Sequence, residues 1–176
     1  MAEIEIHAHH AHEADQVGKT VSIMVALTGI VLAIVTIGSH RAHTSAVIHR
    51  TEANDQWAFY QAKKTREHLV EGIAGLAGTV TVNDAQSARA LADKLSKDGQ
   101  RYSQEAKDIQ KEAQEREAAS DREERRALRL DIAEGFLDLG LVLSSLYFLS
   151  KRRFFPVLGG TAAVVGAVIG ATNFLL

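Results

Sequence analysis

The sequence predicts an all-α membrane protein with about three transmembrane helices and a long antiparallel helical hairpin, similar to a coiled coil, between the first and second spans. Apolar stretches occur near both ends of the chain, and a charged segment rich in helix-forming residues lies between them. A single proline in 176 residues favours long, uninterrupted helices. The mean hydropathy of −0.06 is therefore the average of two very different regions.

The first apolar stretch predicts a transmembrane helix over residues 19–39. Its centre, Val21 to Gly38, has about 18 uncharged residues, close to the roughly 20 that cross a bilayer. A buried core helix is the alternative, but a chain this small has no core able to surround it. Residues 1–18 form a polar, His-rich tail. Because a cleavable signal peptide begins with positive charge and this tail is acidic, we expect a retained anchor.

The C-terminal part predicts two further spans, over residues 131–150 and 154–176. A tight basic turn, Lys151 to Arg153, joins them, and Pro156 lies just inside the start of the last span. The second span is less apolar than the other two because it contains Glu134 and Asp138.

Residues 40–130 predict a soluble helical hairpin. Gly78 is the expected end of its first arm, and Asn83 or Asp84 caps the second. The second arm carries a seam with steps of four and three residues, which favours packing against a partner helix. The seam comprises Ala88, Ala92, Leu95, Gly99, Tyr102, Ala106, Ile109 and Ala113. On the first arm the expected partners are Ala53, Trp57 and Tyr60, followed by Ala62, Leu69, Ile73 and Leu76. Loosely paired, solvated helices are the alternative.

Three carboxylates share one side of the second predicted span. Asp131, Glu134 and Asp138 are spaced at i, i+3 and i+7. A carboxylate within hydrocarbon normally faces protein or water, so Glu134 and Asp138 are a candidate ion site. The alternative is that the acids lie near the headgroups and pair with Arg126 or Arg129. We favour this alternative for Asp131 and Glu134, and both interpretations stay open for Asp138.

The last span has a small-residue pattern. Gly166 and Gly170 form a GxxxG pair, and Gly159 precedes them. Small residues four apart allow helix backbones to approach closely in lipid, which predicts tight packing within the chain or between copies.

Two further features are candidate binding sites. Four tail histidines, His7, His9, His10 and His12, could hold a divalent metal, but their spacing matches no defined site type, and we favour a solvated tail. The apolar stretch from Leu69 to Val82 falls at the predicted hairpin tip, where it forms either a contact site for a protein partner or a small local core.

Several function classes are disfavoured. There is no cysteine, so thiolate chemistry and disulfides are excluded. A net charge of −2 gives no basic field for nucleic acid. No nucleophile elbow, phosphate-binding glycine loop or HExxH metalloprotease motif occurs, so we expect no enzyme and no cofactor.

A polar and aromatic block follows the first predicted span. It reads NDQWAFYQAK and contains Asn54, Asp55, Trp57, Tyr60, Gln61 and Lys63. With the anchor before it and two spans at the end, the chain resembles a bacterial family of small, uncharacterised membrane proteins with an ND-x-W-x-x-YQAK block after the first span. The resemblance covers most of the chain in layout, depends for its specificity on this block, and implies architecture and a bacterial source but no catalytic residue.

These observations predict a non-enzymatic protein of the bacterial inner membrane. We expect it to self-associate as a scaffold or accessory subunit. An oligomeric cation channel or transporter that uses Asp138 and Glu134 is the alternative. Arginines on both flanks of the hairpin favour a cytoplasmic hairpin, whereas the basic turn at Lys151 favours the opposite orientation.

Overall fold

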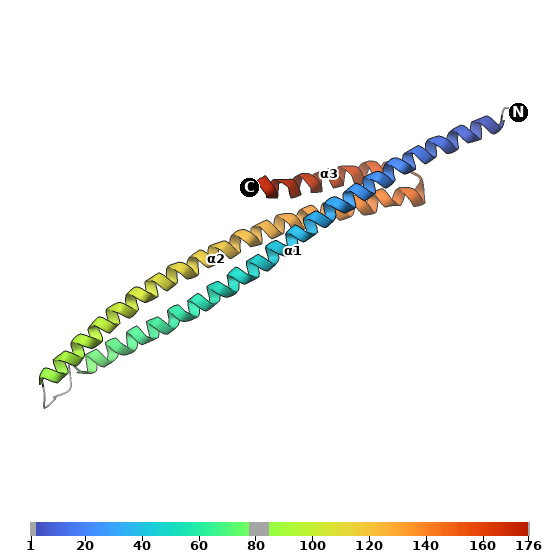
Figure 1. The fold of residues 1–176 in the computed structure, drawn as a ribbon. Coiled ribbons are helices and arrows are strands. Elements are labelled where there is room, and N and C mark those ends of the chain that lie inside the picture. Colours follow the sequence, from blue (N-terminus) through green and yellow to red (C-terminus); the bar gives the residue numbers. More distant parts are fainter. Residues whose placement is uncertain (1–2, 78–84, 176) are drawn as a thin grey trace. The chain divides into compact units, whose positions relative to one another are not determined.

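The computed structural model describes the backbone of residues 3–77 and 85–175 and the side chains of residues 16–77 and 86–173. Within these residues the chain is helical apart from the turn at residues 151–153, and it has no strands (Figure 1). Helix α1 spans Glu3–Ala77, α2 spans Ala85–Ser150 and α3 spans Phe154–Leu175. All three contain stretches long and apolar enough to cross a membrane.

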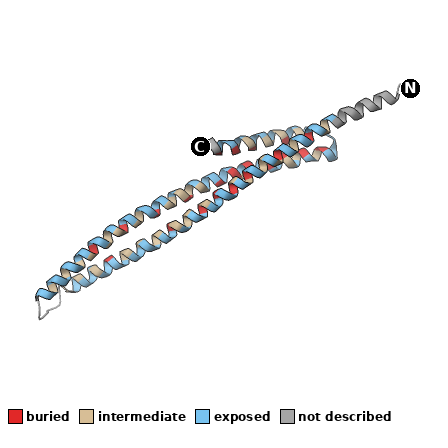
Figure 2. Cartoon of the chain, viewed as in Figure 1, coloured by how far each residue is buried: buried red, intermediate tan, exposed pale blue. Residues whose placement is uncertain are grey.

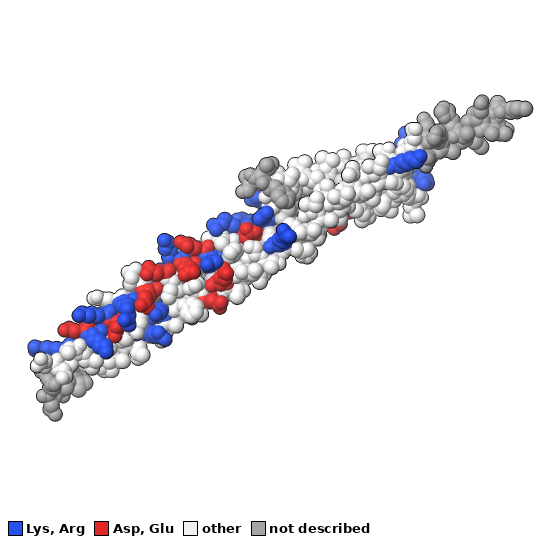
Figure 3. Space-filling view, viewed as in Figure 1, with Lys and Arg blue, Asp and Glu red and all other residues white. Residues whose placement is uncertain are grey.

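The helices contribute to two compact units. Unit 1 contains Met1–Thr44 and Glu123–Leu176, and unit 2 contains Ser45–Arg122. Parts of α1 and α2 therefore occur in both units, whereas α3 belongs to unit 1 alone. On the face shown in Figure 3, charged side chains gather on unit 2, while most of the described part of unit 1 is uncharged.

The core of unit 1 lies where α1, α2 and α3 pack together. Val35 of α1 and Leu130, Ala133 and Leu137 of α2 form its buried centre. Partly buried side chains of α1 and α3 surround this centre: Val31, Leu32, Ala163, Ala167 and Ile169. The outward surface of the same unit is also apolar, with Ile23, Ile34 and Val164 more than half exposed.

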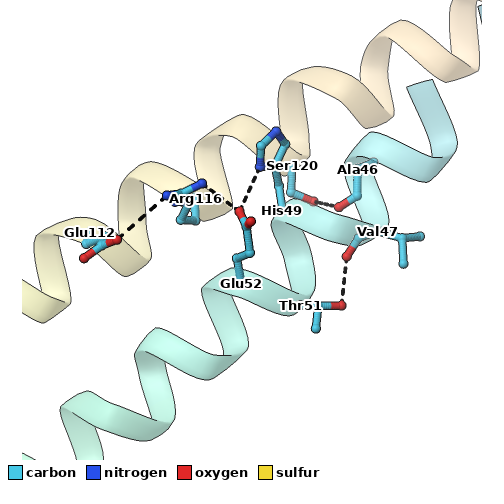
Figure 4. Close-up of polar contacts among 8 residues, drawn as sticks. All are labelled: Ala46, Val47, His49, Thr51, Glu52, Glu112, Arg116 and Ser120. Carbon is cyan, nitrogen blue, oxygen red and sulfur yellow. Dashed lines mark hydrogen bonds and ion pairs between the residues drawn. The ribbon is translucent and has the colours of Figure 1, made fainter. Parts of the chain in front are cut away.

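In unit 2, α1 and α2 contact each other in antiparallel order. Near one end the Ser120 hydroxyl donates a hydrogen bond of 2.9 Å to the carbonyl oxygen of Ala46 (Figure 4). The buried apolar residues of the contact are small, with Ala53 from α1 and Ala106 and Ala113 from α2 (Figure 2). Alanine leaves little side-chain bulk between two helices, so the backbones can lie close together.

The seam residues of α2 are buried to different extents. Gly99 is buried and lies opposite Val70 of α1, whose Cγ1 would be 3.9 Å from a β-carbon at Gly99. Other seam residues are half-buried: Ala88, Ala92, Leu95, Tyr102 and Ile109.

The second half of the expected α1 stripe is wrong. Ala53 is buried and Trp57 and Tyr60 are half-buried, but the residues expected further along, Ala62, Leu69, Ile73 and Leu76, are exposed. The side of α1 that contacts α2 instead continues through Lys63, Lys64 and Glu67. The two lysines lie three and four residues after Tyr60, and Glu67 lies four and three residues after them. The buried Glu67 accepts a 2.7 Å hydrogen bond from Lys64 on its own helix, which compensates its carboxylate for lost water.

The turn between α2 and α3 is tight. Lys151 adopts a left-handed backbone conformation, with φ of 57°, and its amide donates a 2.8 Å hydrogen bond to the Tyr147 carbonyl. This is a usual way to end a helix, although glycine is the residue that adopts it at least cost.

The small seam of unit 2 gives the first prediction. Replacing Ala113 by leucine inserts three carbons where two backbones meet, and such overpacking typically costs about 1–3 kcal/mol. We expect A113L to lower the thermal midpoint of the helical circular dichroism signal of the full chain in mild detergent. The matched control is A118L, because Ala118 is exposed on the same helix. Equal midpoints for the two variants would contradict the close contact.

Candidate functional site

Asp131 and Glu134, the first two of the three carboxylates that share one side of α2, form hydrogen bonds to α1. The Ser39 hydroxyl donates a hydrogen bond to one oxygen of Asp131, and His43 Nε2 lies 2.9 Å from the other. One turn further along, the Thr36 hydroxyl donates a 2.8 Å hydrogen bond to Glu134. Three polar side chains, spaced along one side of α1, therefore meet two carboxylates on α2.

The expected partners of these acids are wrong. We expected Arg126 or Arg129 of the same helix, but Arg126 pairs with Glu123 at 3.7 Å, and Arg129 is exposed. The acids are partly buried against α1, so the side chains that α1 presents take the place of the arginines. Repeated steps of three and four in Thr36, Ser39 and His43 were the available sequence signal.

Asp138 differs from the other two acids. Its side chain is exposed and has no hydrogen-bond or ion-pair partner among the described residues. Its surroundings on the outer side of α2 are apolar or small: Leu139 and Val142 are each 56% exposed, and Gly135 has open space around its α-carbon. An isolated carboxylate thus lies on an apolar surface.

The backbones of α2 and α3 approach each other at glycines. A β-carbon added to Gly140 would lie 2.7 Å from the carbonyl oxygen of Gly159, and one added to Gly159 would lie 2.6 Å from that of Gly140. At Gly166 the added carbon would meet the carbonyl oxygen of Ala133 at 2.7 Å. Real β-carbons do not approach carbonyl oxygens so closely, so these positions admit only glycine without movement of a backbone.

The remaining glycine of the predicted packing group meets α1. A β-carbon on Gly170 would lie 3.0 Å from Cγ2 of Val35. Sequence reasoning identified Gly159, Gly166 and Gly170 on α3 but missed Gly140 and Ser144, which lie opposite Gly159 on α2. The sequence signal that could have identified them is a set of residues on α2 spaced at steps of three and four. The structure buries all six: Leu130, Ala133, Leu137, Gly140, Ser144 and Tyr147.

Ion pairs join α1 and α2 along unit 2. Arg116 of α2 contacts Glu52 of α1 at 2.7 Å, and Nδ1 of His49 lies 3.2 Å from the same carboxylate (Figure 4). Arg50 of α1 contacts Asp121 of α2 at 2.8 Å. These side chains flank the alanine seam, and in the observed register opposite charges of the two helices face each other.

The aromatic block lies in unit 2 and has two sides. On its inner side, Trp57 and Tyr60 make an edge-to-face contact with centroids 5.5 Å apart, and Lys63 reaches Glu105 and the ring of Tyr102 on α2. Its outer side is exposed and carries Asn54, Asp55, Phe59 and Gln61.

The two lysines at the end of this block have different partners. Lys64 bonds to Glu67 on its own helix, and the lysine that reaches α2 is Lys63.

Two glutamates of unit 2 have perturbed acidities. The hydrogen bond from Lys63 lowers the pKa of Glu105, and the hydrogen bond from Lys64 lowers the pKa of Glu67. The same contact with Glu67 raises the pKa of Lys64. Both ion pairs are therefore stable in their charged forms at neutral pH.

The family of the chain follows from comparison with family models. The model described as a domain of unknown function, DUF4337, matches residues 17–176. The chain belongs to the DUF4337 family. The expectation of an uncharacterised family is confirmed at this level. Neither the curated proteins nor the solved structures gave a match.

The tail histidines lie before the DUF4337 domain. The side chains of His7, His9, His10 and His12 are outside the described residues. Within residues 16–77 and 86–173, no group of three or more His, Cys, Asp or Glu side chains is arranged to hold a metal ion.

The predicted tip contact is described only on its α1 side. Leu69 and Leu76 are 61% and 66% exposed, so this part of the DUF4337 domain presents apolar surface. Residues 78–82 of the tip lie outside the described residues, as do the proposed end and caps at Gly78, Asn83 and Asp84.

The glycine contacts of the DUF4337 domain give a second prediction. G166L places a bulky side chain against the Ala133 carbonyl and Leu137, so it must separate α2 from α3. We expect the yield of monodisperse protein in mild detergent to fall several-fold, whereas V165L is tolerated because Val165 is 43% exposed. Size-exclusion chromatography after matched expression measures both. Indistinguishable yields would show that the glycine contact does not hold the helices together.

The ion pairs give a prediction on pH. A glutamate whose pKa is lowered by folding stabilises the folded state above its ordinary pKa of about 4.3, and that contribution disappears as the pH falls through the lowered value. We expect the native chain to be more stable than E67Q/E105Q at pH 7, with the difference vanishing in strongly acidic buffer. Thermal unfolding followed by circular dichroism at several pH values measures this. A difference that stays constant with pH would contradict the proposed role of the carboxylates.

Proposed function

We propose that this protein is a non-enzymatic, multi-pass membrane protein that self-associates and serves as a scaffold or accessory subunit of a membrane assembly. Its proposed spans are residues 19–39, 131–150 and 154–176. A hairpin over residues 40–130 joins the first two, and the basic turn at Lys151 to Arg153 joins the last two. The exposed apolar surface of unit 1 supports membrane insertion. Soluble monomers rarely expose contiguous apolar patches of more than a few hundred Å², and here large apolar side chains cover the outward sides of all three helices.

The single observation that carries self-association is the isolated carboxylate of Asp138. A charged group facing hydrocarbon costs a few kcal/mol, and acids within spans normally face protein or water. Within one chain Asp138 has no polar partner among the described residues, and its side chain is exposed on an apolar surface. Contact with a second copy removes the carboxylate from lipid and supplies a polar partner.

The surface around Asp138 suits a helix–helix contact. Gly135, Asp138, Val142 and Ser145 follow steps of three, four and three along α2, and all are exposed. This spacing keeps one line of a helix against a neighbour. Gly135 and Ser145 are small, which lets another backbone approach, and small and polar residues drive helix association in lipid.

The hairpin is the proposed partner-binding part. Its outer surface carries the exposed side of the aromatic block, with Phe59 60% exposed beside Asn54 and Asp55. Its tip presents Leu69 and Leu76. A charged helical pair with localised apolar groups suits a scaffold, because the apolar groups can supply specific contacts to a partner.

We place the protein in the inner membrane of a bacterium with the hairpin in the cytoplasm. Arg41 and Arg50 after the first span and the arginines from Arg122 to Arg129 before the second support this orientation.

Self-association is tested at Gly135. A β-carbon at this position meets no other atom within 4 Å, so G135L leaves the fold of the single chain intact. We expect the native chain to be an oligomer in mild detergent and G135L to shift toward monomer, with unchanged helical content. Size-exclusion chromatography with light scattering gives the mass. The matched control is G18L, because Gly18 also has open space around it but lies on α1.

Three outcomes would contradict the proposal. A native chain that is monomeric at all concentrations would overturn self-association. Association that persists in both G135L and D138L would place the interface elsewhere. If native protein in liposomes conducts cations and D138N keeps the oligomer but abolishes the flux, the protein is a cation pathway, because only the charge of the carboxylate has then been removed.

A further inference from the structure

An apolar groove runs along unit 1 between α1 and α3. Its volume is about 910 Å³. Its floor includes Met24 and Gly160, which lie close together because a β-carbon on Gly160 would be 3.2 Å from the methionine sulfur. Ile23 and Leu27 of α1 and Val157 and Val164 of α3 form its walls. Each of these four side chains is more than half exposed, so the groove is open to the surroundings of the helices.

The few polar groups in the groove are already satisfied. Thr28 donates to the carbonyl of Met24 at 2.9 Å, and Thr161 donates to that of Leu158 at 2.8 Å. Thr20, the remaining polar side chain of the lining, donates to the carbonyl of Gln16 at 3.1 Å. The lining is therefore almost entirely apolar, which suits a hydrocarbon chain. From Thr20 to Val31 the groove is about 16 Å long at 1.5 Å per residue, which is close to half of a hydrocarbon core of about 30 Å.

The end of the groove near Thr20 and Pro156 is basic. The turn of Lys151, Arg152 and Arg153 immediately precedes α3, and Lys19 immediately precedes Thr20. Arg152 and Arg153 are exposed and form no ion pair among the described residues. Lys151 lies 5.9 Å from the centroid of the Tyr147 ring, which holds its ammonium group near the turn. Lysines and arginines are visible on the corresponding surface of unit 1 (Figure 3).

From this combination we infer that unit 1 binds an anionic phospholipid. One acyl chain lies in the groove between α1 and α3, and the phosphate lies against Arg152 and Arg153. The length of the groove matches one leaflet, and the cations lie at only one end of it, as the geometry of a single lipid molecule requires. Guanidinium groups form paired hydrogen bonds to phosphate oxygens, which favours them for a headgroup site. This inference rests on the proposed membrane insertion.

The test compares two lipids that differ in charge. Full-length protein in dodecyl maltoside is mixed with dioleoylphosphatidylglycerol or dioleoylphosphatidylcholine, and native mass spectrometry measures the lipid retained. We expect preferential retention of phosphatidylglycerol. One basic residue near an anionic headgroup is worth about fivefold in affinity, so R152Q/R153Q should bind this lipid about 25-fold more weakly. The control is R125Q/R129Q, which removes two exposed arginines that lie outside the groove and turn.

The groove itself is tested separately. V164W fills the groove and should lower the retention of both lipids, while V168W should not, because Val168 is 57% exposed but lies outside the groove. Equal retention of the two lipids by the native chain, or an unchanged preference in R152Q/R153Q, would overturn the inference. Alkaline carbonate extraction of cell membranes separates the two proposals. A chain that carbonate removes would overturn membrane insertion and this site together, whereas an integral chain without a lipid preference would overturn this site alone.

Discussion

The backbones of α2 and α3 touch at Gly140, Gly159 and Gly166, and this contact determines which side of each helix the rest of unit 1 can use. Dispersion forces and weak polar contacts act only at short range, so the two backbones must lie close together. At these positions a β-carbon would meet a carbonyl oxygen of the facing helix, so the close approach requires glycine. With that side of α2 occupied by α3, its polar residues Asp131 and Glu134 are directed to α1. The outer side, with Asp138, has no partner among the residues that the structure describes.

Unit 2 solves the same packing problem by different means. The buried apolar side chains among its described residues are alanines, which contribute little buried area each, and its flanks carry ion pairs such as Arg116 with Glu52. Exposed ion pairs are worth only about 0–1 kcal/mol each, so they select the register more than they supply stability. A pairing of this kind is stable because it is long.

The sequence was informative where a pattern repeats along one helix, and less so where two helices must be aligned. The steps of four and three through Gly99, Ala106 and Ala113 identify residues that the structure buries, because helical periodicity alone determines their side. The exposed Leu69 and Ile73 show the limit. Their hydrophobicity predicted that they contact α2, but the side of α1 that carries Ala53 and Trp57 continues through Lys63 and Glu67. The acids of α2 were assigned to arginines on their own helix, since the register that brings Ser39 and Thr36 opposite them is not encoded locally.

The polar contacts between α1 and α2 have a consequence for how the chain is made. On the proposed topology, the second span carries Asp131 and Glu134 and is the least favourable of the three to transfer into lipid. Thr36, Ser39 and His43 belong to the first span and its flank, which the ribosome completes about ninety residues earlier. On this topology the first helix is already in the bilayer when the second leaves the translocon, so its polar side chains can form hydrogen bonds to the acids of the second. Insertion of the second span then depends on the first, and a chain whose first span has been exchanged for a generic apolar helix loses that assistance.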